Sequence, residues 1–562
     1  MKITGAQAII ESLLAEGVDL VFGYPGGAIL PTYDALFESK ERIRHVLVRH
    51  EQGAAIAAEG YAKSSGRTGV CIATSGPGAT NLVTGIADAM LDSVPLVCIT
   101  GQVASSLIGT DAFQEADIVG ITIPITKWNI QVSRAEDIPN AIAKAFYYAK
   151  DGRPGPVLVD ITKDAQAGMM EFTEYAKYVP RGKKSTQHKH SDMQFIEIAD
   201  LLNNAKRPLI LAGNGVGIAN AEEELVKLAE KATIPVACTL HGLHSFPSNH
   251  EYFVGLLGMH GNYAPNILTN EADVILAIGM RFDDRVTGNL ARYAKQAKII
   301  HVDIDFAEIN KNVRSHMHVQ ADAKYAISHI LRFVQSNNHK EWHHRFKHLH
   351  DQEYEQVIKA ELSHKGDMIR MPQAMDLVSR KTKGEAIVVP DVGQNQMVAM
   401  RYYKFQKPKS HISSGGLGTM GFALPAAIGA KMANPDREVI CVAGDGGIQM
   451  NIQELGVILQ EKLPVKILLL NNNYLGMVRQ WQEMFYEERY SFVDLVSPDF
   501  VALANAYGIK ARKVTSPDEL EEAVDEMLAS KEAYFLEVVV EKREKVFPMI
   551  PAGSAVDEIR LS

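Results

Sequence analysis

Short apolar runs alternate with longer stretches of helical spacing along most of the chain. The pattern begins with GVDLVFGYPG at 17–26, and similar runs follow at helix-length intervals. Each run ends in glycine or polar residues, as strands do where they enter a turn. This pattern predicts βαβ units and a mostly parallel sheet. The other strands expected in this first unit lie within 44–50, 68–78, 95–101 and 155–162.

The same alternation occurs in two further units, so the predicted fold class is α/β with three doubly wound parallel-sheet domains. The domains are expected at residues 1–164, 192–336 and 371–562. Expected strands of the central and last domains lie within 207–217, 233–240, 272–282, 297–305, 384–393, 437–446, 464–473 and 533–541.

Two polar segments separate the three domains. Residues 165–191 end in PRGKKSTQHKHS and are expected to form an irregular linker. Residues 337–370 contain NNHKEWHHRFKHLHD, which favours a solvated helical connector. The alternative for this second segment is a metal site, although the histidine spacing fits no compact ligand set.

Composition excludes several classes of protein. The chain has 562 residues, of which 46% are hydrophobic and 22% charged, as in ordinary globular proteins. A net charge of -9 is mild and argues against a nucleic-acid partner. We expect no membrane span and no signal peptide, and hence a cytoplasmic protein. The cysteines form no CxxC pair, which argues against a disulfide framework or zinc site; they are Cys71, Cys98, Cys238 and Cys441.

Polar clusters follow two neighbouring strands of the last domain. The run VICVAGDGG ends in Asp445, Gly446 and Gly447, and VKILLLNNN ends with Asn472 among three asparagines. Ligands bind at the carboxyl ends of parallel strands in open α/β sheets. A carboxylate and an amide oxygen can hold Mg²⁺, and glycines let a diphosphate approach the backbone. Either cluster alone could be an ordinary turn, but their combination favours a site.

Two more stretches need an explanation. HEQGAAIAAEG at 50–60 places Glu51 on an alanine-rich helical face, where burying a lone carboxylate is costly. From these residues alone, a packing helix with a satisfied glutamate explains it. LILAGNGVGIANA at 209–221 is a glycine-rich turn between strand and helix. By itself, this turn is weak evidence for a dinucleotide.

Together these motifs resemble the catalytic subunit of acetohydroxyacid synthase (acetolactate synthase), a thiamine diphosphate-dependent enzyme. The resemblance covers nearly the whole chain. It implies a pyrimidine-binding domain first, an FAD-binding domain in the centre and a diphosphate-binding domain last. The stretches that carry it, besides GDGG and NNN, are YPGGAILPTYDAL, RHEQGAAIAAEGYA, SGPGATNLVTGIADA, GRPGPVLVDITKD, SSGGLGTMGFALPAAIGA and VKILLLNNNYLGMVRQWQEMFY.

The resemblance implies three cofactors: thiamine diphosphate, Mg²⁺ and FAD. It assigns the metal to Asp445, Asn472 and the main-chain carbonyl of Tyr474. Thiamine diphosphate contacts are implied for Gln394, Gly418, Met420, Gly446, Gly447 and Met477. The RFDDRVTG segment favours the flavin-containing branch of the family, in which the flavin has a largely structural role. The implied FAD contacts are Arg153, Gly213, Gly215, Met259, His260, Gly261, Gly279, Arg281, Asp283, Arg285, Val286, Asp303, Ile304 and Asp322.

The implied reaction is decarboxylation of pyruvate followed by carboligation. Pyruvate as acceptor gives 2-acetolactate and 2-oxobutyrate gives 2-aceto-2-hydroxybutyrate, both precursors of branched-chain amino acids. Glu51 matches the glutamate that hydrogen-bonds N1′ of the aminopyrimidine ring, and Gly27 offers a backbone N–H near the reacting centre. Trp481 matches a position that favours 2-oxobutyrate. The implied substrate channel contains Phe113, Gln114 and Lys163.

The resemblance also bears on partners and on competing functions. Relatives are homodimers or homotetramers with active sites at the chain interface, often with a small regulatory subunit. Asn395 and Ile56 stand where histidine is frequent in relatives, which puts a diphosphate contact at Asn395 in question. One alternative is another enzyme of the superfamily, such as pyruvate oxidase or glyoxylate carboligase, although Glu51 argues against the latter. The other is a non-catalytic scaffold with the same fold.

Overall fold

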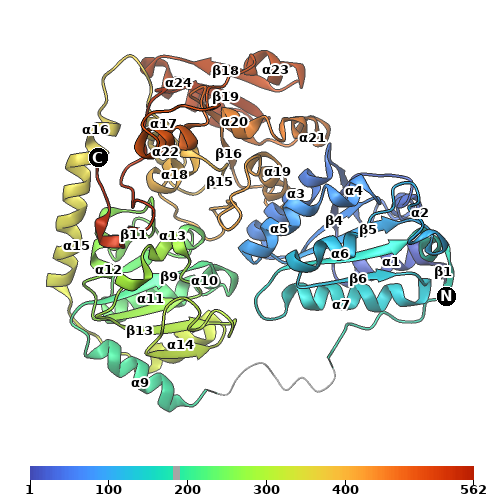
Figure 1. The fold of residues 1–562 in the computed structure, drawn as a ribbon, viewed down its shortest axis with the longest axis horizontal. Coiled ribbons are helices and arrows are strands. Elements are labelled where there is room, and N and C mark those ends of the chain that lie inside the picture. The colour runs from blue at the N-terminus through green and yellow to red at the C-terminus, as the bar shows by residue number, and fades with distance from the viewer. Residues whose placement is uncertain (181–189) are drawn as a thin grey trace.

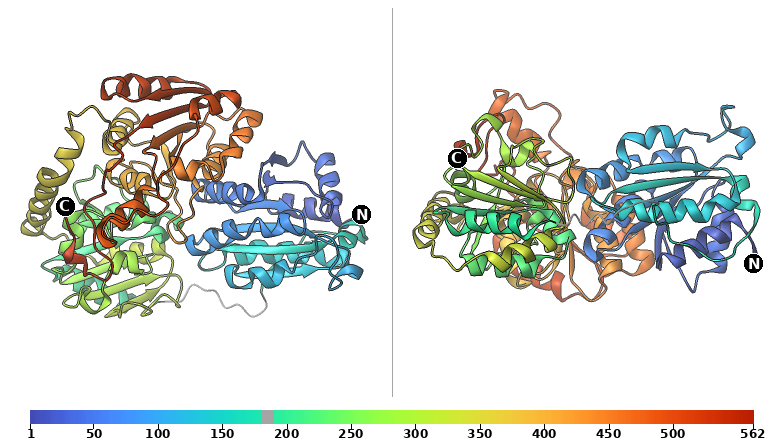
Figure 2. Two further views of the ribbon diagram at one scale, coloured as in Figure 1. Left: turned by 45° about the horizontal axis from the view of Figure 1, so that its top comes forward. Right: turned by 90° about the horizontal axis from the view of Figure 1, so that it is seen from below.

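The computed structural model describes residues 1–180 and 190–562 and contains three α/β domains, each built on a parallel sheet (Figure 1). The central and last domains lie side by side, and the N-terminal domain lies at one end of the molecule (Figure 2). Of the helices that these residues form, none combines the length and the apolar character needed to cross a membrane.

The N-terminal sheet has the strand order β3-β2-β4-β5-β7-β6. Its inner strands β4, β5 and β7 are buried at every position, as expected for a parallel sheet covered by helices on both faces. The strands are β2 (Leu20–Gly23), β3 (Arg44–Leu47), β4 (Gly69–Ala73), β5 (Leu96–Gln102), β6 (Trp128–Val132) and β7 (Pro156–Thr162). The main helices are α1 (Gly5–Ala15), α2 (Leu30–Glu38), α3 (Glu51–Ser65), α5 (Val83–Asp92) and α7 (Ile138–Lys150).

The central sheet has the order β11-β10-β9-β12-β13-β14. Its strands are β9 (Pro208–Ala212), β10 (Val236–Cys238), β11 (Phe253–Leu256), β12 (Val274–Ile278), β13 (Lys298–Asp303) and β14 (Met317–Gln320). The helices around it are α9 (Asp192–Asn203), α10 (Asn214–Ile218), α11 (Glu222–Ala232), α12 (Tyr263–Thr269), α13 (Asp284–Thr287) and α14 (Ala323–Phe333).

The last sheet has the order β15-β16-β17-β19-β18. After it, the C-terminal segment returns to the central domain, where the N–H of Ile550 donates to the carbonyl of Met259 at 2.8 Å. The strands are β15 (Ile387–Pro390), β16 (Val439–Gly444), β17 (Lys466–Asn471), β18 (Lys510–Val514) and β19 (Tyr534–Val539). Helices used below are α18 (Gln394–Tyr402), α19 (Ala423–Ala433), α20 (Asp445–Ile448), α21 (Leu455–Glu461) and α22 (Gly476–Phe485).

The predicted strands all form, but in the three parallel sheets the prediction misses β6, β11, β14 and β18, which are all edge strands. An edge strand has a neighbour on one side only, and its sequence is less continuously apolar than that of an inner strand. β18, with the sequence KARKV, is largely solvent-accessible. β17, with the sequence KILLLN, is fully buried.

The prediction of an irregular linker from residue 165 is wrong for its first part. Residues Lys163–Ala167 form helix α8, and Met169–Glu171 form strand β8, which pairs antiparallel with β1 (Lys2–Thr4). The pairing depends on the distant N-terminus, so the local pattern around residue 170 does not reveal it. The charged end of the predicted linker, residues 181–189, lies outside the described residues.

The connector is helical, as predicted, but one face of it is buried. Helix α15 (Lys340–Glu353) continues through Tyr354–Ile358 into α16 (Lys359–Leu362). Trp342, Phe346 and Leu349 of α15 pack into a core of the central domain. Its histidines belong to no cluster of potential ligands close enough to share a metal ion, among the residues whose structure is described. The metal alternative therefore has no support here.

A close helix pair joins the first and last domains. Helix α3 packs against α19, and their side chains share one hydrophobic core. A Cβ added at Gly60 would lie 2.1 Å from the carbonyl oxygen of Ala426, and one at Gly429 would lie 1.8 Å from that of Ala57. The small residues of HEQGAAIAAEG thus allow two backbones to approach.

We expect Gly429→Ala to destabilise the protein by about 1–3 kcal/mol or more, because backbone rather than a flexible side chain blocks the new methyl group. Chemical denaturation would measure the loss. Gly366→Ala is the matched control, since its Cβ would meet only the ring of His364, which can move. Equal stability of the two variants would contradict the close packing of α3 on α19.

Candidate functional site

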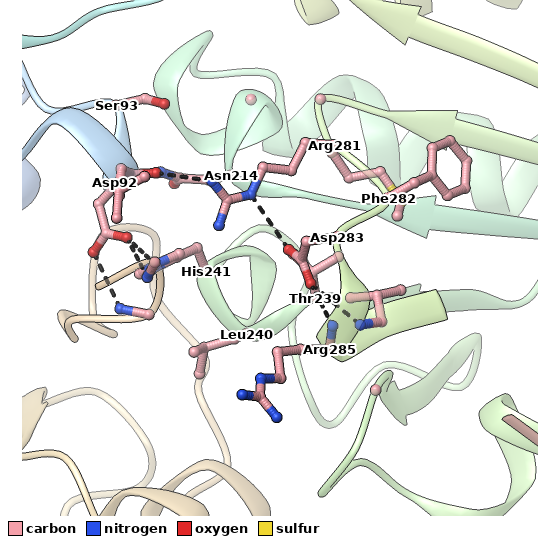
Figure 3. A pocket seen from close by; sticks show the side chains of 18 of the residues that line it. Asp92, Ser93, Asn214, Thr239, Leu240, His241, Arg281, Phe282, Asp283 and Arg285 are labelled. Carbon is pink, nitrogen blue, oxygen red and sulfur yellow. Dashed lines mark hydrogen bonds and ion pairs between the residues drawn. The ribbon is translucent and has the colours of Figure 1, made fainter. Parts of the chain in front are cut away.

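A cavity of about 580 Å³ opens where the three domains meet. Its walls come from the carboxyl ends of β9, β10, β12 and β13, from the end of α5, and from a loop of the last domain at 413–418. Ligands of open α/β sheets bind at this end of the strands, and the volume suits a cofactor. Figure 3 shows the part of the cavity around Asp92, His241 and Arg281.

Most of the residues predicted to contact FAD line this one cavity. Gly213 and Gly261 do not, but each supports its wall: a Cβ at Gly213 would lie 2.2 Å from the carbonyl oxygen of Gly279. The sequence-predicted residues that line the cavity are Arg153, Gly215, Met259, His260, Gly279, Arg281, Asp283, Arg285, Val286, Asp303, Ile304, Asp322, Gly418, Met477 and Trp481.

Charged and hydrogen-bonding side chains of the central domain line the cavity and determine which ligand it can bind. Asp283 caps α13 by accepting hydrogen bonds from the N–H groups of Arg285 and Val286 at 3.0 and 3.2 Å. Its other oxygen lies 3.4 Å from Nε of Arg281. His260 is buried, its Nδ1 has no hydrogen-bond partner among the described residues, and burial lowers its pKa to about 3. Two guanidinium groups and an unpaired ring nitrogen fit an anionic ligand with hydrogen-bonding groups.

Arg153 lines the cavity, but its guanidinium already has partners within the chain. Its Nη1 lies 2.6 Å from Oε1 of Glu308 and 3.6 Å from Oδ2 of Asp305, and its Nε donates to Oγ of Ser93 at 2.7 Å. The residue therefore joins the first domain to the central one. A contact of Arg153 with FAD stays a prediction.

Asp445 and Asn472 follow adjacent parallel strands, where Gly444 is in register with Leu470. Asp445 is only 1% exposed, and burial raises its pKa to about 6. Asn472 accepts a hydrogen bond from the N–H of Tyr474 at 3.1 Å. A buried carboxylate beside an amide oxygen fits a hard divalent cation, whose charge would offset the cost of ionisation.

The residues predicted to bind the diphosphate surround this strand end. Gln394 accepts from Nδ2 of Asn472 at 3.2 Å, and a Cβ at Gly446 would lie 3.6 Å from Cε of Met420. Gly418 has a φ of 74° and open space around its Cα. Glycine suits this left-handed conformation, and the space leaves its backbone open to a ligand.

Asn395, the departure from the family pattern, has a clear structural role. Its Nδ2 donates to the carbonyl of Asp391 at 2.7 Å and to that of Val442 at 3.2 Å. The side chain thus ties the end of β15 to the end of β16.

Asp391 is a supporting residue that the sequence reasoning missed. Its buried carboxylate accepts from the N–H groups of Gly421 and Ala423, both at 3.0 Å, and burial raises its pKa to about 6. A Cβ at Gly447 would lie 2.6 Å from its Oδ1, so it packs directly behind the GDGG turn. The signal was available, since PDVG places a carboxylate immediately after a strand.

The predicted catalytic residues of the first domain lie outside the cavity. Glu51 begins α3, is 9% exposed and accepts from Nδ2 of Asn81 at 2.9 Å. A Cβ at Gly78 would lie 3.3 Å from its Oε1, and one at Gly76 would lie 2.9 Å from Cα of Gln114. Glu51 and Gln114 therefore flank the same SGPG turn.

The remaining predicted residues of this domain are more open. Gly27 has nothing within 4 Å of an added Cβ, Lys163 begins α8 at the surface, and Phe113 is 87% exposed. An isolated chain thus presents Gly27, Lys163 and Phe113 at its surface.

Comparison with known proteins agrees with this geometry. Three family models match the chain: the N-terminal TPP binding domain of thiamine pyrophosphate enzymes at residues 3–121, their central domain at 196–330 and their C-terminal TPP binding domain at 391–538. The fold and site therefore define a thiamine pyrophosphate enzyme.

Full-length relatives identify the family to which the chain belongs within this class of enzymes. The chain is 44% identical to the acetolactate synthase isozyme 2 large subunit of Escherichia coli over 99% of both chains. It is 46% identical to the probable acetolactate synthase large subunit of Methanocaldococcus jannaschii, over 99% of this chain and 95% of the relative. The chloroplastic acetolactate synthase of Arabidopsis thaliana is also 46% identical, over 99% and 84%. The chain belongs to the acetolactate synthase large-subunit family.

Proposed function

We propose that this chain is a catalytic acetolactate synthase subunit, which decarboxylates pyruvate and joins the two-carbon unit to a second 2-oxoacid. The observation that carries the proposal is a pair of buried carboxylates, Glu51 and Asp445, one in each thiamine-binding domain and each beside a glycine-rich strand end. Full-length relatives named for this activity support it.

Each proposed cofactor has residues that fit it. Mg²⁺ would be held by Asp445, Asn472 and the carbonyl of Tyr474, and the diphosphate by the backbone of Gly446 and Gly447. FAD would occupy the cavity between the domains, where the arginines and His260 offer polar contacts. When bound, thiamine diphosphate supplies the electron sink for decarboxylation.

The chain's own residues have defined tasks in this scheme. Glu51 would hold a proton at N1′ of the aminopyrimidine, and the Gly27 N–H would orient the substrate carbonyl. Lys163 would attract the anionic 2-oxoacid past Phe113 and Gln114. Trp481, at the cavity wall, would contact the acceptor and favour 2-oxobutyrate over pyruvate.

A second copy of the chain is proposed to complete each active site. Glu51 is buried, but Gly27, Lys163 and Phe113 of the proposed site lie at the surface, and the large apolar side chains of Phe113, Phe492 and Val496 are 87%, 98% and 100% exposed. Burying such groups favours association. We further propose a small regulatory partner, because the relatives are called large subunits, and cytoplasmic location, because four buried free cysteines suit a reducing compartment.

The function is tested with purified protein, pyruvate, thiamine diphosphate, Mg²⁺ and FAD. We expect two pyruvate molecules to give one CO₂ and one acetolactate, without reduction of a redox dye. Adding 2-oxobutyrate should divert product to 2-aceto-2-hydroxybutyrate. Dye reduction coupled to pyruvate consumption would indicate a pyruvate oxidase instead, and absence of any product would support the scaffold alternative.

A further inference from the structure

Asp92, at the end of α5, is the point where all three domains meet. Its Oδ1 accepts from Nε2 of His241 in the central domain at 3.0 Å and from the N–H of Gly416 in the last domain at 2.7 Å. Its Oδ2 accepts from Nζ of Lys63 at 2.7 Å and from the N–H of Gly415 at 3.2 Å. Figure 3 shows the contact of Asp92 with His241 beside the cavity.

The loop at 413–418 fits closely between the other two domains. A Cβ at Gly415 would lie 2.3 Å from Nε2 of His241, and one at Gly416 would lie 2.7 Å from Cβ of Leu91 and 2.8 Å from Oδ1 of Asp92. Both glycines are therefore required by contacts with the first and central domains. The loop has no room to shift toward either of them.

Lys63 supplies the positive charge of this cluster. Its ammonium lies 2.7 Å from Oδ2 of Asp92 and 2.8 Å from Oε1 of Glu59, and it donates to the carbonyl of Ser413 at 2.7 Å. Glu59, Asp88 and Asp92 are close enough to share a metal ion, but the ammonium already occupies that place. The Lys63 ammonium therefore links Glu59 and Asp92 of the first domain to the loop of the last domain through the carbonyl of Ser413.

Asp92 and Lys63 both keep their charges near neutral pH. Burial alone would raise the pKa of Asp92, but the neighbouring His241 and Lys63 hold that pKa well below its usual range. Burial also opposes charging of Lys63, yet Asp92 and Glu59 raise its pKa above the ordinary value. An ionised Asp92 accepts stronger hydrogen bonds from the loop N–H groups than a neutral side chain would.

The loop forms part of the cavity wall and leads directly into the proposed thiamine diphosphate contacts. Residues 414–418 line the cavity; Gly418 is itself one of these contacts, and Met420 comes shortly after it. Ser414 continues the network, since its Oγ donates to Asp88 at 2.6 Å and accepts from the N–H of Thr419 at 2.8 Å.

We propose that Asp92 is a positioning residue for the reaction: it fixes the 413–418 loop between the flavin cavity and the thiamine diphosphate contacts. The proposal rests on the proposed function, because it concerns the same two cofactors. Asp92 acts through the backbone of Gly415 and Gly416 and through His241, without a role in the chemical steps.

The test is Asp92→Asn, which keeps the shape and turns one acceptor oxygen into a donor facing Lys63. We expect the dissociation constant of FAD, measured by flavin fluorescence on flavin-free protein, to rise about tenfold, as the loss of one charged hydrogen bond would predict. At saturating cofactors, kcat should fall about tenfold through misplacement of the loop. KM for pyruvate should change less than about twofold, because Asp92 is not one of the residues proposed to contact the substrate.

Asp273→Asn is the matched control. Asp273 also caps backbone N–H groups, those of Lys206 and Arg207 at 2.8 and 2.9 Å, but it does not line the cavity. The Asp273→Asn variant should leave FAD binding and kcat unchanged. His241→Leu is the second variant, in case Asp92→Asn does not fold; it should weaken FAD binding in the same direction.

Two results would overturn the proposal. One is normal FAD binding and kcat in both Asp92→Asn and His241→Leu. The other is a lower unfolding temperature with unchanged FAD affinity and kcat, since the role would then be structural only. A wild-type protein that binds FAD but makes no acetolactate would instead count against the proposed function, while a change of FAD affinity in Asp92→Asn would still support the loop's role.

Discussion

Glu51→Gln should keep the fold and lose nearly all carboligation, with kcat lower by roughly 10²–10⁴-fold, the usual contribution of a positioned acid or base. Glutamine can replace the hydrogen bond with Asn81 at 2.9 Å, so the start of α3 has no reason to move. It cannot exchange a proton with N1′ of the aminopyrimidine. The measurement is acetolactate formation at saturating pyruvate and cofactors.

Two comparisons separate loss of chemistry from loss of structure. Thiamine diphosphate should still bind to Glu51→Gln, because the proposed metal and diphosphate contacts are in the last domain; isothermal titration would show this. Glu41→Gln removes an equal charge from the exposed surface of the same domain and should leave kcat unchanged. Near-normal turnover in Glu51→Gln would show that its assignment is wrong.

The cavity residues were predicted from the family resemblance, and the local strand pattern agrees with that prediction. A parallel strand that ends in glycine and polar residues places those residues at the ligand-binding edge of the sheet, whatever the rest of the chain does. Gly279, Arg281 and Asp283 follow β12 in this way, and Asp303 ends β13. The strands alone therefore place these side chains at the ligand-binding edge, and it is the family resemblance that assigns them to FAD.

Asp92 and His241 could not be found by the same reasoning. In the sequence, Asp92 is typical of the polar end of an amphipathic helix, and His241 is typical of a turn that follows a short strand. Their contact joins positions 149 residues apart, and the contact of Asp92 with Gly416 spans 324. Only the packing of three domains brings them together, and no periodicity in the chain encodes that packing.

The fold shows the same division between local and long-range signals. Inner strands such as β17 are buried throughout because both faces are covered, and their apolar runs, ILLL in β17, reveal them in the sequence. β8 was missed because its partner, β1, lies at the opposite end of the domain's sequence. The alanine-rich pattern of α3 predicted a packing helix, but it did not reveal that the partner is α19 in the last domain, against which Ala57 and Gly60 pack.

Asp445→Asn should abolish most of the Mg²⁺-dependent binding of thiamine diphosphate. The affinity for thiamine diphosphate should fall by about 10–100-fold or more, because losing even a residue that only supports a metal ligand lowers metal affinity by that factor. Without metal, the ionised carboxylate is costly, because burial raises its pKa to about 6. The metal-free variant should therefore unfold at the same temperature as the wild type or a higher one. Mg²⁺ with thiamine diphosphate should raise the unfolding temperature of the wild type only.

The raised pKa of Asp445 also predicts how metal binding by the wild type depends on pH. Protons compete with the metal once the pH falls through about 6, so the affinity for Mg²⁺ should fall there and be restored above it. Asp436→Asn, at an exposed position just before β16, is the matched control and should bind as the wild type does. If Asp445→Asn retained normal Mg²⁺-dependent binding, or if it unfolded well below the wild type without metal, Asp445 would be a structural residue and the metal would have to bind elsewhere.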